Sequence, residues 1–194
     1  MSHQTKTARD GNPDQEPLLG FFSIVELTKD LFRGGILLTD VRGKPRDFRC
    51  TSAIRPNAIQ KVLYGRTLAE HLALELCGLP LLNALPNQPA VLLADAPDSL
   101  ALRPESEVPM LWLRRQADAP SASVSGAAGD AVELIASESG AFEAVMASVK
   151  AGHEADLEWV LPLREMARTL DPLEPFGRIA AAMKLVQDKA GQNK

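Results

Sequence analysis

The chain of 194 residues is 45% apolar and 24% charged, a balance typical of a folded globular protein and not of an intrinsically disordered one. No apolar run approaches the roughly 18 residues that a membrane-spanning helix needs, and the polar N-terminus lacks the apolar stretch of a secretory signal. With two cysteines and a net charge of −4, we expect a cytoplasmic protein without a disulfide framework or a membrane contact.

The charge is unevenly distributed along the chain. Between Lys29 and Arg66 the sequence holds nine basic and three acidic residues, so this segment carries +6 while the remainder carries −10. A chain polarised in this way can present a basic face to an anionic partner and stay soluble through its acidic part. The alternative is that these charges are scattered over a hairpin and two helix faces.

The N-terminal part is predicted to begin with a disordered tail over residues 1–17, which is polar and has no apolar period. The segment FFSIVELTKDLF (21–32) suits a strand or a helix, and we favour a helix for its second half. The glycine pair at 34–35 is predicted to interrupt the chain. Residues 35–52 read as a β-hairpin whose return strand places Phe48 and Cys50 on the core face.

Two helices are predicted to follow the hairpin. Asn57 and Gln60 have the spacing of a capping box at the start of a short helix that Gly65 ends. The sequence TLAE from Thr67 predicts a second capping box, and Gly78 stands where a left-handed C-terminal cap is expected.

The remainder alternates between strands and helices. Strands are predicted in AVLLAD (90–95), SLALRP (99–104), VPMLWLRR (108–115) and AVELIAS (131–137). Helices are predicted in GAFEAVMASVKAG (140–152), after Pro162, and over residues 176–190. A flexible loop is expected at 118–130. It would separate an α+β unit over residues 18–117 from the C-terminal part of the same domain over 131–194.

The order of these elements predicts the α+β class, with a mixed, mostly antiparallel sheet, helices packed on one side and a helical C-terminal end. Catalytic chemistry is weakly indicated. Asp40 and Asp47, with Arg49 on the paired strand, are the candidates for a metal-dependent nuclease or phosphodiesterase. Cys50 is expected to be a structural thiol, and no cofactor or metal site with recognisable ligand spacing is expected.

A binding surface is indicated more strongly, where the hairpin meets two helix starts. Its candidate residues are Arg49, Arg55, Lys61, Tyr64 and Arg66. Free amides at helix starts and nearby guanidinium groups both favour anions. A nucleotide-sensing pocket lined by Arg49, Tyr64 and Arg66 is a further alternative.

The block GGILLTD, followed by FRCTS-x-I-RPN-x-x-Q-x-VLYG-x-TL, resembles an uncharacterised family of bacterial proteins over about residues 34–103. That family has no assigned activity, so the resemblance implies a defined structural unit and no function. We therefore expect a non-enzymatic subunit of a bacterial multi-protein system, which binds an acidic protein or a nucleic-acid backbone. Homo-oligomerisation is left open.

Overall fold

The computed structural model describes residues 16–118, 131–137 and 140–192. The predicted tail (1–17) and loop (118–130) lie almost wholly outside the described residues. Within the described part, no helix is long and apolar enough to cross a membrane.

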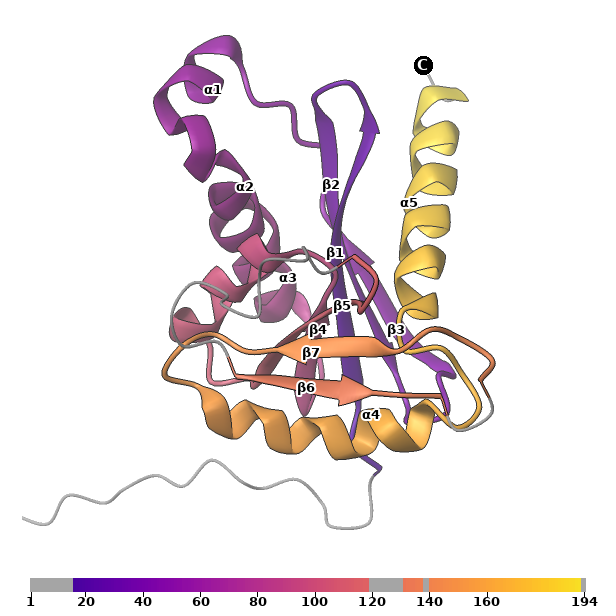
Figure 1. Cartoon of the computed structure of the whole chain (residues 1–194). Helices are drawn as coiled ribbons and strands as arrows, with labels where there is room; N and C mark the ends of the chain where they lie inside the picture. Colours follow the sequence, from indigo (N-terminus) through magenta and orange to yellow (C-terminus); the bar gives the residue numbers. More distant parts are fainter. Residues whose placement is uncertain (1–15, 119–130, 138–139, 193–194) are drawn as a thin grey trace, which may run out of the picture.

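A single seven-stranded sheet organises the chain (Figure 1), in the spatial order β3-β2-β1-β4-β5-β7-β6. Its strands are β1 (Leu19–Thr28), β2 (Leu31–Thr39), β3 (Pro45–Cys50), β4 (Val91–Ala94), β5 (Met110–Arg115), β6 (Val132–Ile135) and β7 (Val145–Ser148). Only the β1–β4 and β4–β5 pairs are parallel. The predicted α+β class with a mixed, mostly antiparallel sheet is confirmed, and so is the β2–β3 hairpin.

The helical elements fall between β3 and β4 and at the C-terminal end. They are α1 (Ala58–Tyr64), α2 (Leu68–His71), the π-helical segment η2 (Leu72–Gly78), α3 (Leu79–Ala84), α4 (Val160–Met166) and α5 (Glu174–Gln192). Short 3₁₀ segments are η1 (Gly65–Thr67), η3 (Pro97–Glu105) and η4 (Glu154–Trp159). The predicted C-terminal helix is thus confirmed as α5.

Helices cover both faces of the sheet, so the prediction of helices on one side was wrong. Phe22 and Ile36 pack in one apolar cluster with Cys77 of η2. Phe21 of β1 packs in the other cluster, where its ring meets Phe176 of α5 edge-on at a centroid distance of 5.5 Å. Alternate side chains of a central strand point to opposite faces, so β1 and β2 need a helical cover on each side.

Three predicted elements have the wrong type. Residues 21–28 continue as strand β1, because Val25 and Leu27 face one cluster while Ile24 faces the other, which is the two-residue period of a strand. The predicted helix at 140–152 contains strand β7 instead, whose backbone is paired on both sides by β5 and β6. The predicted strand at 99–104 is the 3₁₀ segment η3.

The glycine pair at 34–35 lies inside β2 and does not interrupt it. A Cβ added to Gly34 would lie 2.5 Å from Cys77 Cβ, and one added to Gly35 would lie 3.0 Å from Ile179 Cγ2. The two glycines therefore let η2 and α5 approach the sheet closely from opposite faces.

The second predicted helix also differs from expectation. Thr67 makes no side-chain cap, and Gly78 has a helical φ of −66°, so neither the second capping box nor the left-handed cap forms. The chain instead continues through η2 into α3. Pro80 of α3 has no N–H, and in a regular α-helix its ring would clash with the carbonyl four residues earlier. The wider π-helical turn of η2, which comes directly before α3, accommodates this proline. Gly78 is needed for space, because an added Cβ would lie 2.4 Å from Leu102.

Candidate functional site

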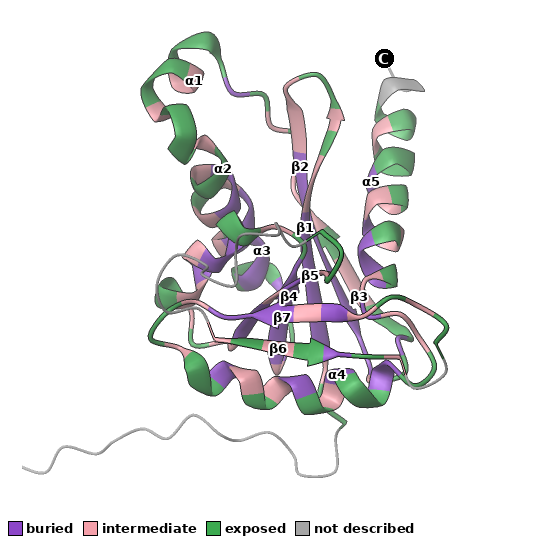
Figure 2. Cartoon of the chain, in the orientation of Figure 1, coloured by how far each residue is buried: buried purple, intermediate pink, exposed green. Residues whose placement is uncertain are grey.

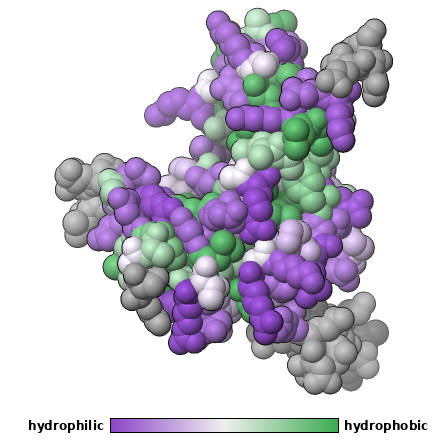
Figure 3. Space-filling view, turned by 90° about the vertical axis from the view of Figure 1, so that its right-hand side faces the viewer, coloured by the Kyte–Doolittle hydropathy of each residue, from purple (hydrophilic) through white to green (hydrophobic). Residues whose placement is uncertain are grey.

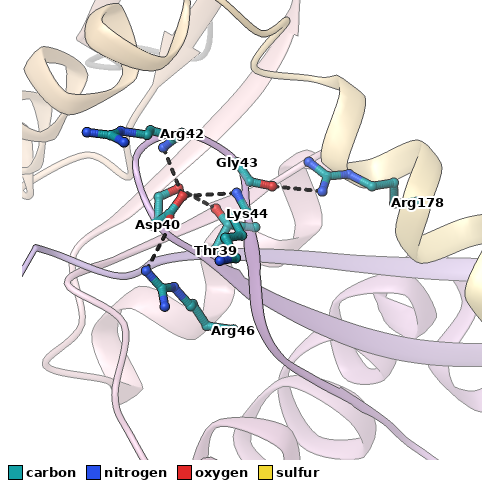
Figure 4. A network of polar contacts seen from close by, with 7 residues as sticks. All are labelled: Thr39, Asp40, Arg42, Gly43, Lys44, Arg46 and Arg178. Atoms are coloured by element: carbon teal, nitrogen blue, oxygen red, sulfur yellow. Dashed lines mark hydrogen bonds and ion pairs between the residues drawn. The ribbon is translucent and has the colours of Figure 1, made fainter.

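The carboxylate of Asp40, a candidate catalytic group, is hydrogen-bonded within the turn between β2 and β3 (Figure 4). Its Oδ1 accepts hydrogen bonds from the backbone amides of Arg42 (3.0 Å) and Lys44 (2.9 Å), and its Oδ2 pairs with Arg46 Nη2 at 3.0 Å. Arg178 of α5 donates to the carbonyl of Gly43 at 2.8 Å and holds the same turn from the other side. Burial alone would raise the pKa of Asp40, but the two amides and the Arg46 guanidinium outweigh it and hold that pKa below its ordinary value.

The other two residues of the nuclease hypothesis pair with each other. Arg49 Nε lies 3.0 Å from Asp47 Oδ2, and both side chains belong to the edge strand β3. Across the described residues, no group of three or more His, Cys, Asp or Glu side chains could hold a metal ion. Asp40, Asp47 and Arg49 therefore have local partners and do not form a metal cluster of that size.

Helix α1 begins as the sequence predicts, with a capping box. The side chain of Asn57 accepts from the amide of Gln60 (2.8 Å), and the side chain of Gln60 accepts from the amide of Asn57 (2.9 Å). Lys61 Nζ then pairs with Asp30 Oδ2 at 2.5 Å, and Asp30 lies in the turn between β1 and β2. This contact ties α1 to the end of the β1–β2 hairpin, and hydrogen bonding to Lys61 lowers the pKa of Asp30.

The end of the molecule that carries α1 and the β1–β2 turn extends beyond the rest of the sheet. In Figure 1, α1, the β1–β2 turn and the C-terminal half of α5 extend in the same direction beyond the rest of the sheet. Figure 2 shows α1 coloured as exposed and intermediate, and none of its residues is buried. Figure 3, viewed from the α5 side, shows apolar side chains interspersed with hydrophilic ones on this projecting part.

One side of α1 is apolar and faces solvent. Ile59, Val62 and Leu63 are 70%, 81% and 78% exposed, and we call these three side chains the α1 apolar face. Positions three and four apart in a helix lie on the same side, so the three form one continuous surface. Sequence reasoning missed this surface, although the i, i+3, i+4 spacing was visible, because such spacing normally marks the buried side of a helix.

The predicted binding residues differ in their position relative to the α1 apolar face and in their partners within the chain. Arg55 precedes α1 and Arg66 follows it; both are exposed, and neither has an ion pair among the described residues. Lys61 forms an ion pair with Asp30. The Tyr64 ring stacks on the His71 ring at a centroid distance of 4.0 Å. Arg49 lies apart from them on β3, opposite Ile36 of β2.

A second carboxylate that the sequence did not single out is Asp95. It follows β4, beside the parallel strand β1, and its Oδ2 accepts a hydrogen bond from Ser23 Oγ at 2.6 Å. Asp95 is exposed as a residue, yet the protein atoms around its carboxyl group desolvate it in part and raise its pKa, an effect that the Ser23 hydroxyl opposes. Its only sequence signal was its position at the end of an apolar run.

The described residues also contain an open pocket of about 460 Å³ between β5 and α5. It is lined by Arg115, Asp171, Leu173, Glu174, Gly177, Arg178 and Ala181. Arg115 pairs with Asp171, and Arg178 pairs with Glu174 at 2.8 Å. Its charged groups therefore already have partners within the chain.

Comparison with known proteins shows a likeness at the level of the fold. No family model and no curated protein matches the chain. A crystal structure of Ciona intestinalis endonuclease V, in complex with a 24mer DNA containing an inosine followed by a ribo-adenosine, has a TM-score of 0.51 and 14% sequence identity. A variant of that enzyme with a 23mer DNA has a TM-score of 0.51 and 13% identity. In each case the alignment covers 95% of this chain and 90% of the other.

Proposed function

We propose that this protein is a non-enzymatic subunit of a bacterial multi-protein system that binds an acidic protein partner through α1. The observation that carries the proposal is the exposure of the α1 apolar face on a helix with no buried residue. Contiguous exposed apolar surface with a polar rim is characteristic of protein interaction sites.

The contacts that order α1 support its role as a preformed docking surface for a partner. An isolated helix of seven residues is too short to be stable in water, yet α1 has both bonds of its capping box and the Lys61–Asp30 ion pair. These contacts use its polar atoms and leave the apolar face free. A preformed surface lowers the entropic cost of binding.

The charges around the α1 apolar face indicate the chemistry of the partner. Arg55 and Arg66 stand at the two ends of the helix without ion pairs among the described residues, and the surrounding segment carries +6. A complementary partner would present apolar side chains flanked by Asp or Glu. Exposed arginines at the rim should mainly affect the association rate and its salt dependence.

The test is to identify a partner by crosslinking and mass spectrometry in the native host, and then to measure binding with the two purified proteins by calorimetry. Val62→Asp combined with Leu63→Asp should weaken binding at least tenfold, because the charges would be desolvated in the interface. Leu161→Asp is the control, since Leu161 is also a largely exposed leucine (65%) and lies on α4, away from α1. Unchanged affinity in the α1 double variant would refute the proposal.

Nucleic acid is the second candidate partner, favoured by the likeness of the fold to DNA-bound endonuclease V. If Arg55 and Arg66 contact phosphates, anisotropy with labelled DNA or RNA should show a salt slope of about 0.9 per contact, reduced by about two contacts in a double Glu variant. Incubation of inosine-containing DNA with Mg²⁺ or Mn²⁺ tests the nuclease alternative. Cleavage lost in Asp47→Ala would support it, and cleavage unchanged in Asp40→Ala and Asp47→Ala would rule out those carboxylates.

A further inference from the structure

Helix α1 depends on few contacts for its order. None of its seven residues is buried, and a helix of that length is not stable in water by itself. Its capping box lies within the helix and its N-cap, and the hydrogen bond from Thr67 Oγ1 to the Tyr64 carbonyl joins it only to the adjoining η1. The contacts that α1 makes with more distant elements therefore have a large share in keeping it helical.

Two side chains of α1 make polar or ring contacts with such elements in the part of the chain that the structure describes. At the C-terminal end of the helix, the Tyr64 ring stacks on the His71 ring of α2. In the middle of the helix, Lys61 Nζ lies 2.5 Å from Asp30 Oδ2 in the turn between β1 and β2. The Lys61–Asp30 pair thus connects the body of α1 to the sheet.

The same ion pair determines which side of α1 faces outward. Successive residues of an α-helix are rotated by about 100°, so Lys61 lies about 150° around the helix from the middle of the α1 apolar face. The β1–β2 turn therefore holds α1 from the side opposite to Ile59, Val62 and Leu63. This arrangement explains why these three side chains are at least 70% exposed.

The turn presents Asp30 in a defined position. Asp30 has a φ of 60°, a left-handed conformation that Asp and Asn adopt more readily than most other residues, and its amide donates to Glu26 Oε1 at 2.7 Å. The backbone of the turn is therefore held independently of the ion pair. Hydrogen bonding to Lys61, together with the charges of Lys29 and Arg55, lowers the pKa of Asp30, so this carboxylate faces several cations.

We propose that Asp30 is a positioning residue for the α1 apolar face: its ion pair with Lys61 keeps α1 helical and keeps that face turned toward solvent. Both side chains are about one-third exposed, so salt screens the pair, and ionic strength regulates the population of ordered α1. This inference rests on the function proposed for α1, because it concerns the regulation of the same surface.

Hydrogen exchange of the full-length protein measures the order of α1 without a partner. Asp30→Asn removes the charge and keeps a side chain that tolerates the left-handed conformation, so the turn should be retained. The variant should raise the exchange rates of the backbone amides of residues 61–65 about two- to fivefold, the range expected for the loss of one exposed ion pair.

Salt dependence and conservative substitution separate this role from a merely structural one. Raising NaCl from about 0.05 M to about 0.5 M should speed exchange of the same amides in the wild type and not in Asp30→Asn. Lys61→Gln should match Asp30→Asn, whereas Lys61→Arg should keep the protection of the wild type. The variant that combines Asp30→Asn with Lys61→Gln should exchange no faster than either single variant, because both remove the same interaction.

Asp47→Asn is the matched control. It removes the same charge from an ion pair with Arg49 on the edge strand β3, which lies apart from α1 in Figure 1, so the amides of α1 should exchange as in the wild type.

The proposal is overturned if Asp30→Asn leaves the exchange of residues 61–65 unchanged, or if salt affects the variant and the wild type equally. Exchange that rises as much in β1 and β2 as in α1 would also overturn it, because Asp30 would then support the hairpin alone. These outcomes need no partner, so they are separate from the binding test with Val62→Asp and Leu63→Asp, which can fail while Asp30 still orders α1.

Discussion

At the scale of single residues, Asp40 and Arg114 are opposite cases. The carboxylate of Asp40 accepts two backbone amides and one guanidinium, so its position is explained by the turn that it stabilises. The Arg114 guanidinium has a ring contact but no carboxylate among the described residues. The bonds of the buried Asp40 carboxylate are complete within the chain, so this carboxylate supports structure.

Asp40→Asn should lower the free energy of unfolding by about 2 kcal/mol at neutral pH, since hydrogen bonds to a charged group are lost. The folded pKa of Asp40 is lowered, so the stabilising contribution of the carboxylate is present above its ordinary pKa of 3.8 and disappears as the pH falls through the folded value. Urea unfolding of both proteins from pH 7 to pH 2 should therefore show a difference that shrinks below about pH 4. A constant difference would contradict this account.

At the scale of elements, β2 is the strand on which two helices converge. Gly34 contacts Cys77 of η2 on one face and Gly35 contacts Ile179 and Met183 of α5 on the other. The same close packing explains why Cys77 is fully buried, and burial raises the pKa of its thiol to about 11. Cys50, the other thiol, is half-buried and packs at the margin of the opposite cluster.

Gly34→Ala should destabilise the protein by about 2 kcal/mol or more, because the new methyl group would overlap Cys77 Cβ, which cannot move without the backbone of η2. Gly35→Ala is the matched comparison. Its new methyl group would meet Ile179 Cγ2 at 3.0 Å and the flexible Met183 side chain, so we expect a change within about 1 kcal/mol. Thermal denaturation of both variants checks the order, and equal losses would show that the two helices do not differ in this respect.

At the scale of the whole molecule, a buried ion pair joins segments that are far apart in the sequence. Asp156 of η4 is 4% exposed; it accepts from Arg103 Nε (2.6 Å) and Nη2 (3.0 Å) of η3 and from the amide of Met110 in β5 (2.9 Å). This contact fixes the C-terminal part of the chain to the segment that precedes β5. The sheet does the same through the β5–β7 pair.

Asp156→Ala should lower the free energy of unfolding by about 3–5 kcal/mol, because it leaves the buried Arg103 guanidinium without its carboxylate, with only the Ser106 carbonyl as a partner, and removes the acceptor of the Met110 amide. Asp156→Asn should cost less, since one oxygen can still accept from Met110. Chemical denaturation measures both, and a loss below about 1 kcal/mol for the alanine variant would show that the pair contributes little beyond its desolvation cost.

Much of the fold was predictable from local pattern, and the candidate site only in part. The hairpin, the capping box at Asn57, strands β4, β5 and β6 and helix α5 follow from alternation, capping chemistry and apolar spacing, and the structure has them all. Arg55 precedes α1, Lys61 lies within it and Arg66 follows it, and their role in binding stays a prediction. The outward direction of Ile59, Val62 and Leu63 was not predicted, because apolar spacing alone does not say whether another element covers a helix.

The amino-acid sequence by itself determined the α+β class, the polarised charge, the β2–β3 hairpin and the capping box that begins α1. The tertiary structure alone decided that β7 is a strand, that helices cover both faces, and that Gly34 and Gly35 are close-packing positions. It also decided that Lys61 of α1 pairs with Asp30 in the turn between β1 and β2. The physical reason is that these outcomes depend on which neighbours a segment meets across the sheet, and such contacts join residues that are distant in the chain.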